Sequence, residues 1–503
     1  MFTTVAIWLC CFYLSLCLIS FTFNLWLKNS VVFTKEQSRY LKEQKFLIIG
    51  AGISGLAVGY FFKKFNFNFV IVERAQEIGG TWYLNRYPGA AVDVPSFLYQ
   101  YSFFPKTDWP QSFNTSTELY RYLKKFAKWA ELEDNIRFKT SVDDCEWDDE
   151  QKLWKVRLSQ NQKSSDEYFN WTFVCTGSFN EPNKPKFENQ KAFTGQIIHT
   201  GEWPENLSVV GKRVAVIGSG SSAAQTVPGL LDSGAREVVQ FQRTASFIIP
   251  RLLGFKIPRI FQLLMKIYPF AFITRGFFWA FQESLFIGFE YHNSFLNKLL
   301  AKFAHWHRTS TVKDSVLREK LKPEEGVRFG CKRVIVSTAI YEAANDPRYS
   351  LNCSKISEFT SSGILTEDNK EIPVDIIVLA TGFRVHFYPF LKWQMSKSPK
   401  TYNGTFDTQK PNLVYLLGPM TLLGNSSVII MIESQIEFIL RMLKQTSKLK
   451  SRVCLPKETS VQRWISNWEK RIDKSVWTRK YCSSWYQTGD SGVLKVESAI
   501  CLI

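Results

Sequence analysis

Two glycine-rich turns constrain the fold of this chain more than any other feature. The first, Gly50-Ala51-Gly52-Ile53-Ser54-Gly55, follows the apolar run 46–49, and a second apolar run, 69–72, ends at Glu73. Glycines at this spacing permit a tight strand-to-helix turn, close approach of backbone N–H groups to a pyrophosphate, and helix–strand contact. A terminal acid can accept a hydrogen bond from a ribose hydroxyl. Residues 45–73 therefore predict a βαβ unit that binds FAD or NAD.

The pattern recurs at residues 213–243. The apolar run 214–217 leads into Gly218-Ser219-Gly220-Ser221-Ser222-Ala223, and a second run, 238–241, ends without an acid at Gln242, Arg243 and Thr244. A cation there suits a ribose that carries a 2′-phosphate, hence NADP, although Arg243 could also be a solvated strand-end cation. Two such units predict an α/β fold with two Rossmann-type dinucleotide-binding domains, the second inserted in the first. The simplest interpretation of the two units is that one binds a flavin and the other binds the NADPH that reduces it.

Composition and charge exclude several classes. The 503 residues are 45% hydrophobic and 21% charged, which is typical of a globular protein of about three domains or lobes. The net charge of +18 is scattered, with no long Lys/Arg block and no nucleic-acid motif, so we expect no nucleic-acid partner. The ten cysteines show no CxxC or CxxxxC spacing, which argues against a zinc site, any metal site built on paired cysteines, and a dithiol redox pair.

The N-terminus carries an apolar segment. Residues 5–27 contain no charged side chain, and Lys28, Lys35, Arg39, Lys42 and Lys45 follow. About 20 apolar residues are enough to span a bilayer as a helix, and flanking positive charge tends to stay cytosolic. We therefore predict a single-pass N-terminal anchor, in the endoplasmic reticulum membrane, with the body facing the cytosol. A cleaved signal peptide is the alternative.

Further motifs resemble the class B flavoprotein monooxygenases. The stretches 79–82 (GGTW) and 86–90 (RYPGA), with Asp93, are similar to the flavin loop of that class. Residues 193–204 match the FxGxxxHxxxWP fingerprint of type I Baeyer–Villiger monooxygenases at every position. Additional matches are 175–177 (CTG), 380–383 (ATGF) and 484–486 (SWY), so the resemblance runs from about residue 43 to about 490.

The resemblance implies a role for each matching residue. It makes Arg333 the active-site arginine and Asp93 the acid that orients it, although a structural salt bridge between them is the alternative. It implies cofactor contacts for Gly50, Gly52, Gly55, Glu73, Gly80, Thr81, Trp82, Asp93, Gly218, Gly220, Ser221, Ser222, Arg243, Thr244, Lys332, Thr381, Gly382 and Trp485. The fingerprint residues Phe193, Gly195, His199 and Trp203 would couple the two domains, although His199 could also be a core histidine.

The predicted anchor at 1–30 comes first in the domain order. The resemblance then implies a first FAD-binding part at 43–185, an NADP-binding domain at 186–374 and a second FAD-binding part with the C-terminal segment at 375–503. A Phe-rich helical subdomain at about 247–325 lies within the NADP domain; its apolar patches predict either a hydrophobic core or a second contact with the bilayer. The sequence departs from the pattern of the resembled family at two places. Asn425 stands where many members of that family have a histidine, and the C-terminal tail is shorter than is usual in the family.

These features predict an NADPH- and O2-dependent flavin monooxygenase. The resemblance implies Baeyer–Villiger oxidation of a ketone or aldehyde to an ester, lactone or acid through a C4a-peroxyflavin. The apolar content of the helical segment predicts a lipophilic substrate. An always-charged guanidinium with fixed donors suits that chemistry, since it stabilises an anion without losing a proton. N- or S-oxygenation, peroxide production, and a catalytically silent membrane-tethered dinucleotide-binding protein remain the alternatives.

Overall fold

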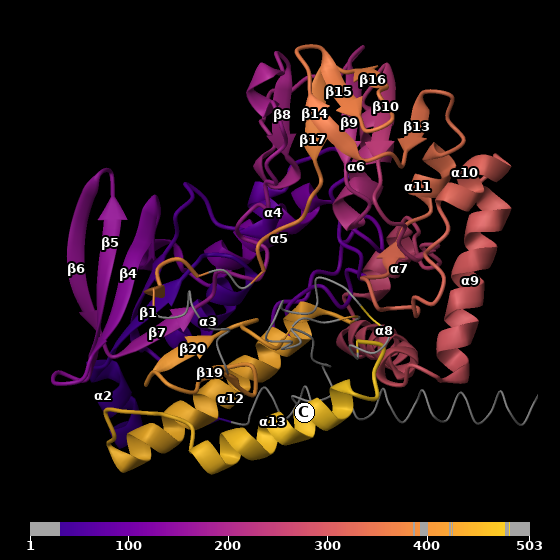
Figure 1. Cartoon of the computed structure of the whole chain (residues 1–503). Coiled ribbons are helices and arrows are strands. Elements are labelled where there is room, and N and C mark those ends of the chain that lie inside the picture. The colour runs from indigo at the N-terminus through magenta and orange to yellow at the C-terminus, as the bar shows by residue number, and fades with distance from the viewer. Residues whose placement is uncertain are drawn as a thin grey trace, which may run out of the picture.

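The computed structural model describes residues 31–385, 388–392, 401–421, 424, 426–477 and 482. Two parallel sheets form its two halves, with the helical segment beside them (Figure 1). The predicted α/β fold with two Rossmann-type units is confirmed by these sheets. The predicted N-terminal anchor at 1–30, Asn425 and Trp485 all lie outside the described residues.

The first sheet is built from both ends of the described chain. Its order is β18-β19-β20-β7-β1-β2-β3, and the four strands from β20 to β2 run parallel. The strands are β1 (Lys45–Ile49), β2 (Asn68–Val72), β3 (Ile136–Arg137), β7 (Trp171–Val174), β18 (Thr401–Tyr402), β19 (Phe406–Asp407) and β20 (Leu413–Tyr415). Buried β-branched and aromatic residues fill both faces of β1, as expected for a parallel strand covered on two sides.

Helices and a small sheet cover the first sheet. On one side pack α2 (Lys35–Glu43), α3 (Ile53–Lys64) and the long α12 (Val428–Leu449), and α4 (Thr81–Leu84), α5 (Ser116–Trp129) and the short helix Glu133–Asn135 follow β2. On the other side lies an antiparallel sheet of β4 (Thr140–Asp148), β5 (Leu153–Gln160) and β6 (Lys163–Phe169). Its Trp154 is fully buried and donates from Nε1 to the carbonyl of Pro411, 3.0 Å away, which ties this sheet to the loop before β20.

In the sequence, all strands of the second sheet lie between the two segments of chain that form the first sheet. Its order is β13-β10-β9-β17-β8, and all strands run parallel. They are β8 (Gln196–His199), β9 (Arg213–Ile217), β10 (Glu237–Phe241), β13 (Tyr349–Asn352) and β17 (Ile376–Leu379). Around them lie α6 (Ser221–Asp232), α11 (Ala339–Ala343), the short helices Gln190–Ala192 and Thr200–Glu202, and a three-stranded sheet of β14 (Ile356–Phe359), β15 (Gly363–Thr366) and β16 (Glu371–Pro373).

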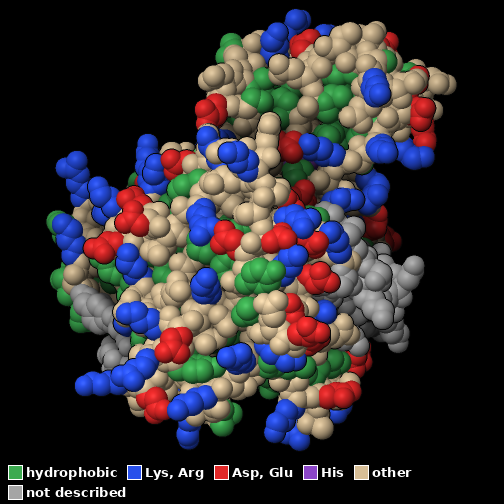
Figure 2. Space-filling view, turned by 90° about the vertical axis from the view of Figure 1, so that its left-hand side faces the viewer, with side chains coloured by type: hydrophobic (Ala, Val, Ile, Leu, Met, Phe, Trp, Pro, Cys, Tyr) green, Lys and Arg blue, Asp and Glu red, His purple; other side chains and the backbone are tan. Residues whose placement is uncertain are grey.

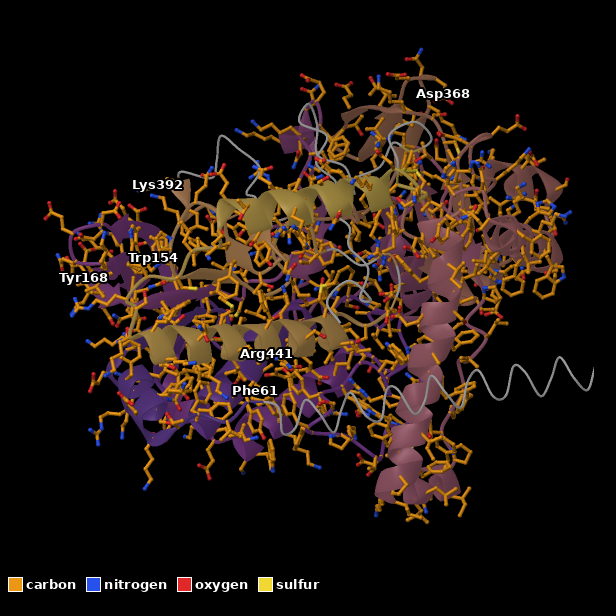
Figure 3. All side chains as sticks on the ribbon, turned by 90° about the horizontal axis from the view of Figure 1, so that it is seen from below. Phe61, Trp154, Tyr168, Asp368, Lys392 and Arg441 are labelled. Carbon is orange, nitrogen blue, oxygen red and sulfur yellow. A yellow bond between two sulfur atoms is a disulfide. The ribbon has the colours of Figure 1, made fainter. Side chains whose placement is uncertain are left out.

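Two labelled residues mark the two halves. In the view from below, Tyr168, on β6, lies at the left-hand edge, and Asp368, in the turn between β15 and β16, lies at the upper right (Figure 3). The face that carries β4–β6 has Lys/Arg and Asp/Glu side chains interspersed over both halves (Figure 2). The positive charge is therefore not gathered into one block on this face.

The predicted helical segment interrupts the second half between β10 and β13. It contains α7 (Arg259–Leu264), α8 (Tyr268–Glu290), α9 (Phe295–Thr311) and α10 (Ser315–Lys320), and its ends are joined by the parallel pair β11 (Ile248–Ile249) and β12 (Ile335–Val336). Among the residues that the structure describes, no helix has both the length and the apolar character needed to cross a bilayer.

One cysteine pair was not expected from the sequence. Cys331 and Cys482 form a disulfide with a Cα–Cα distance of 5.4 Å, although 151 residues separate them along the chain. Spacing motifs detect only pairs that are close in sequence, so they could not indicate this disulfide. Cys175 is a buried thiol.

Candidate functional site

A cavity of about 1690 Å³ lies between the two halves, at the carboxyl ends of the parallel strands. This is where open α/β sheets bind their ligands, because the strand-to-helix turns leave backbone N–H groups pointing outward. Most of the predicted site residues line this cavity. They are Gly50, Gly52, Glu73, Gly80, Thr81, Trp82, Asp93, Gly218, Gly220, Ser221, Ser222, Arg243, Thr244, Lys332, Arg333, Thr381 and Gly382.

The first glycine turn leaves no room for side chains. Gly50 has φ +105°, and a Cβ there would lie 2.8 Å from the carbonyl oxygen of Cys175. A Cβ on Gly55 would lie 1.9 Å from the carbonyl oxygen of Gly50, so this glycine serves helix–strand packing and does not line the cavity. Gly52 is the N-cap of α3, whose N-terminus therefore meets the cavity and favours an anionic group.

Glu73 is held in place by the turn that precedes it. Its Oε2 accepts a hydrogen bond from the Ala51 N–H and its Oε1 accepts one from the Ala75 N–H, both at 2.8 Å. Each carboxylate oxygen has a second lone pair, so Glu73 can still accept a hydroxyl donor from the cavity. The acid is thus oriented for a ribose diol before any ligand binds.

The second glycine turn has the same design. Gly218 has φ +140°, and a Cβ there would lie 2.3 Å from the carbonyl oxygen of Ala380. A Cβ on Gly220 would meet nothing within 4 Å, so the space above the N-terminus of α6 is open. Backbone N–H groups and the hydroxyl residues Ser221 and Ser222 border this opening, which suits a second pyrophosphate.

Cationic and hydroxyl groups converge at the end of β10. The Lys332 ammonium donates to the Thr244 hydroxyl, 2.8 Å away, and the Ser219 hydroxyl donates to the Thr244 carbonyl, 2.7 Å away. The exposed Arg243 lines the same wall of the cavity. Two cations and a hydroxyl at this point form a recess for a doubly charged phosphate, as expected for NADP.

Asp93 and Arg333 form an ion pair across the two halves. The Arg333 Nη2 lies 2.5 Å and its Nε 3.2 Å from Oδ2 of Asp93, and both side chains are partly buried in the cavity wall. The paired donors hold the guanidinium in one orientation. The structure therefore brings together the two residues that the resemblance assigned to catalysis, although they are 240 positions apart in the chain.

Sequence reasoning missed two side chains near this pair. Tyr99 lines the cavity and packs edge-on against Trp82, with ring centroids 5.4 Å apart, and burial raises the pKa of its hydroxyl. Arg251 lies partly buried near Asp93, and burial lowers the pKa of its guanidinium. No spacing pattern singles out either residue, because each reaches the site through a loop.

Two antiparallel connections join the halves. Residues 180–183 run beside 382–384: Pro182 bridges Phe383, the Asn183 N–H donates to the Gly382 carbonyl, and the Arg384 N–H donates to the Glu181 carbonyl. We call these two segments the hinge. Thr381, just before the second segment, lines the cavity, and its hydroxyl donates to the Asn183 carbonyl of the hinge, 2.6 Å away.

One fingerprint residue, His199, bonds to the hinge from outside the cavity. His199 Nδ1 accepts from the Gly201 N–H at 3.0 Å, which leaves the proton on Nε2 to donate to the Gly382 carbonyl, 2.9 Å away. Burial lowers the pKa of His199, consistent with this neutral tautomer. Phe193, Gly195 and Trp203 pack within the second half and do not line the cavity. His199 therefore connects β8 to the hinge, and the coupling role that the resemblance implies for the four residues stays a prediction.

Buried polar atoms in the cavity wall test whether a polar ligand fits. Thr176 Oγ1 and Asn180 Oδ1 line the cavity and are buried, with no hydrogen-bond partner in the described part of the chain. Such atoms cost free energy unless a ligand or water pairs with them. A Cβ on Gly177 or Gly382 would meet nothing within 4 Å, so the cavity is open beside them. Both features fit an extended dinucleotide.

Comparison with known proteins decides the family. The family described as flavin-binding monooxygenase-like matches residues 43–485. The chain belongs to this family. A Baeyer-Villiger monooxygenase of Streptomyces coelicolor is 31% identical over 465 residues, which cover 90% of this chain and 88% of the relative. A Baeyer-Villiger monooxygenase of Pseudomonas aeruginosa is 32% identical over 468 residues, which cover 89% and 86%.

Solved structures of flavin-binding monooxygenases share the fold. An oxidized steroid monooxygenase bound to NADP superposes with a TM-score of 0.79 at 24% identity and covers 91% of this chain and 96% of its own. OTEMO in complex with FAD and NADP (form 2) superposes with a TM-score of 0.80 at 23% identity, covering 92% and 96%. The family match therefore makes the chain a flavin-dependent monooxygenase, and the solved structures show that it has their fold.

Proposed function

We propose that this monooxygenase carries out Baeyer–Villiger oxidation of a ketone or aldehyde. In this reaction the carbonyl compound, O2, NADPH and a proton give an ester, lactone or acid, NADP⁺ and water. Bound FAD supplies the hydride acceptor and the site of oxygen activation. The residues named above hold the two dinucleotides and position charge between them.

The Asp93–Arg333 pair is the observation that carries the proposal. Oxygen insertion into a carbonyl compound develops negative charge on oxygen, and a fixed cation in a partly enclosed cavity stabilises that charge. Arg333 cannot lose its proton under these conditions, so it acts as a constant donor rather than as an acid. The names of the two bacterial relatives support the same activity.

Product analysis tests this function directly. Purified FAD-loaded protein is given NADPH and O2 with a matched panel of ketones, tertiary amines and thioethers. We expect esters or lactones from the ketones, identified by mass spectrometry, at rates well above N-oxide or S-oxide formation. Predominant N- or S-oxidation would contradict the proposal, and so would hydrogen peroxide as the main product with every substrate.

We also propose that residues 1–30 anchor the enzyme in a membrane, with the body facing the cytosol. The uncharged run at 5–27 and the cations that follow it support this arrangement. Protease added to intact microsomes is expected to digest the body and to spare at most the first ~30 residues. Protection of the body, or glycan attached at Asn170 or Asn352, which stand in Asn-x-Ser/Thr acceptor sequences, would place the body in the lumen instead.

A further inference from the structure

The outer side of the helical segment exposes large apolar side chains. Seven of them fall within residues 255–277: Phe255, Ile260, Leu263, Leu264, Ile267, Ile273 and Phe277, with exposed fractions between 37% and 65%. They come from one short stretch of chain, comprising the loop before α7, α7 itself and the first half of α8. We call residues 255–277 the apolar tip. Its outer side is therefore not the hydrophobic core that was one of the two expectations for this segment.

Aromatic contacts on the inner side already hold the tip in place. Phe97 of the first half stacks on Phe278 at 5.2 Å and packs edge-on against Phe261 at 5.9 Å. Phe261 also packs edge-on against Phe270, with ring centroids 5.2 Å apart. Because these rings anchor α7 and α8 to the FAD half, the exposed side chains are not needed to fold the tip.

Charge distinguishes the tip from other exposed apolar surface. No Asp or Glu occurs from residue 238 to residue 282, whereas Lys256, Arg259 and Lys266 lie among the apolar side chains of the tip and are exposed. Two copies of this surface would repel each other, since each carries only cations. Apolar side chains with basic neighbours match the headgroup region of an anionic bilayer, where the cations meet lipid phosphates and the apolar groups enter the acyl boundary.

We infer that the apolar tip docks on the surface of an anionic bilayer. The tip is a second membrane contact, distinct from the proposed N-terminal anchor, and it rests on the surface rather than crossing the bilayer. Ser246, nine residues before Phe255, lines the cavity, so docking holds one wall of the cavity close to the lipid. A lipophilic carbonyl compound dissolved in that bilayer is then the class of substrate that can enter the cavity by the shortest path. This last step rests on the proposed function, whereas the docking itself does not.

Lysine labelling of the full-length protein tests the docking. The protein is reconstituted into vesicles of neutral phosphatidylcholine or of phosphatidylcholine with phosphatidylserine and acylated with a water-soluble reagent; modification is read by mass spectrometry. We expect Lys256 and Lys266 to be protected on the anionic vesicles only, relative to the exposed Lys370 in the same molecules. Three cations near the surface give a preference of about 10²-fold for anionic over neutral lipid.

Two triple variants make the test specific. Ile260→Ser/Leu263→Ser/Ile267→Ser is expected to abolish protection of Lys266, because it removes the apolar contact and leaves every tip cation in place. The matched control Val316→Ser/Leu449→Ser/Leu455→Ser changes equally apolar exposed residues elsewhere and is expected to keep the protection. Both variants should still cofractionate with vesicles through the N-terminal segment.

Three results would overturn the inference. Equal labelling of Lys266 on neutral and anionic vesicles would remove the charge argument. Unchanged protection in the tip variant would show that another surface covers the lysine. Protection without vesicles that grows with protein concentration would mean that a second copy covers the tip. None of these results bears on product identity, so docking and the proposed reaction can fail separately.

Discussion

Arg333→Ala is expected to separate NADPH consumption from product formation. The side chains that hold the NADP ribose and both glycine turns are untouched by this change, so NADPH oxidation and FAD content should stay near the wild-type level. Product formation should fall by about 10² or more, the loss typical of removing one donor to a developing oxyanion. The electrons should then appear as hydrogen peroxide, which a peroxidase-coupled assay measures beside the product.

The conservative variant and a control sharpen this test. Arg333→Lys should also fail, because one ammonium cannot reproduce the two guanidinium donors that meet Oδ2 of Asp93. Arg157→Ala, which removes a comparable ion pair with Asp166 on the surface of β5, should leave product formation unchanged. Loss of FAD or of folding in Arg333→Ala would make the pair structural, and normal product yield would mean that the active site lies elsewhere.

The sequence predicted the parts of the site that depend on local backbone geometry. Gly50 and Gly218 both adopt positive φ beneath a neighbouring carbonyl, and only glycine fits there, so these turns leave a local signature. Glu73 could be predicted for a similar reason. It follows β2, and because β2 pairs with β1, the residue at its end must lie beside the turn that follows β1. Gly55 differs from its neighbours in the turn, because it does not line the cavity and instead lets α3 approach the turn closely.

The remaining parts depend on contacts between distant segments. Nothing in the sequence near Tyr99 indicates that it packs on Trp82 beside the Asp93–Arg333 pair. The Cys331–Cys482 disulfide and the hinge pairing of Asn183 with Gly382 join segments that only the completed fold brings together. The roles of Arg333 and His199 came from resemblance, not from spacing, and they stay predictions. The structure places Arg333 beside Asp93 in the cavity wall and His199 against the Gly382 carbonyl.

Arg243→Ala/Lys332→Ala is expected to abolish the preference for NADPH over NADH. Each charge-assisted contact to the 2′-phosphate contributes roughly 1.5–3 kcal/mol, so losing two should lower kcat/KM for NADPH by about 10² or more. NADH has no 2′-phosphate, so its kcat/KM should hardly change. Steady-state kinetics with both nucleotides, supported by equilibrium binding of NADP⁺, gives the ratio.

The control for this variant keeps the net change in charge but moves it away from the cavity. Lys191→Ala/Lys370→Ala removes two exposed cations beside the β14–β16 sheet, neither of which lines the cavity, and should leave both kcat/KM values unchanged. Thr244→Ala should have a smaller effect than the double variant, because Thr244 supports Lys332 through one neutral hydroxyl. An equal fall for NADH and NADPH would mean that Arg243 and Lys332 stabilise the domain rather than recognise phosphate. Equal kcat/KM for NADH and NADPH in the wild type would contradict the assignment of Arg243 and Lys332 to the 2′-phosphate.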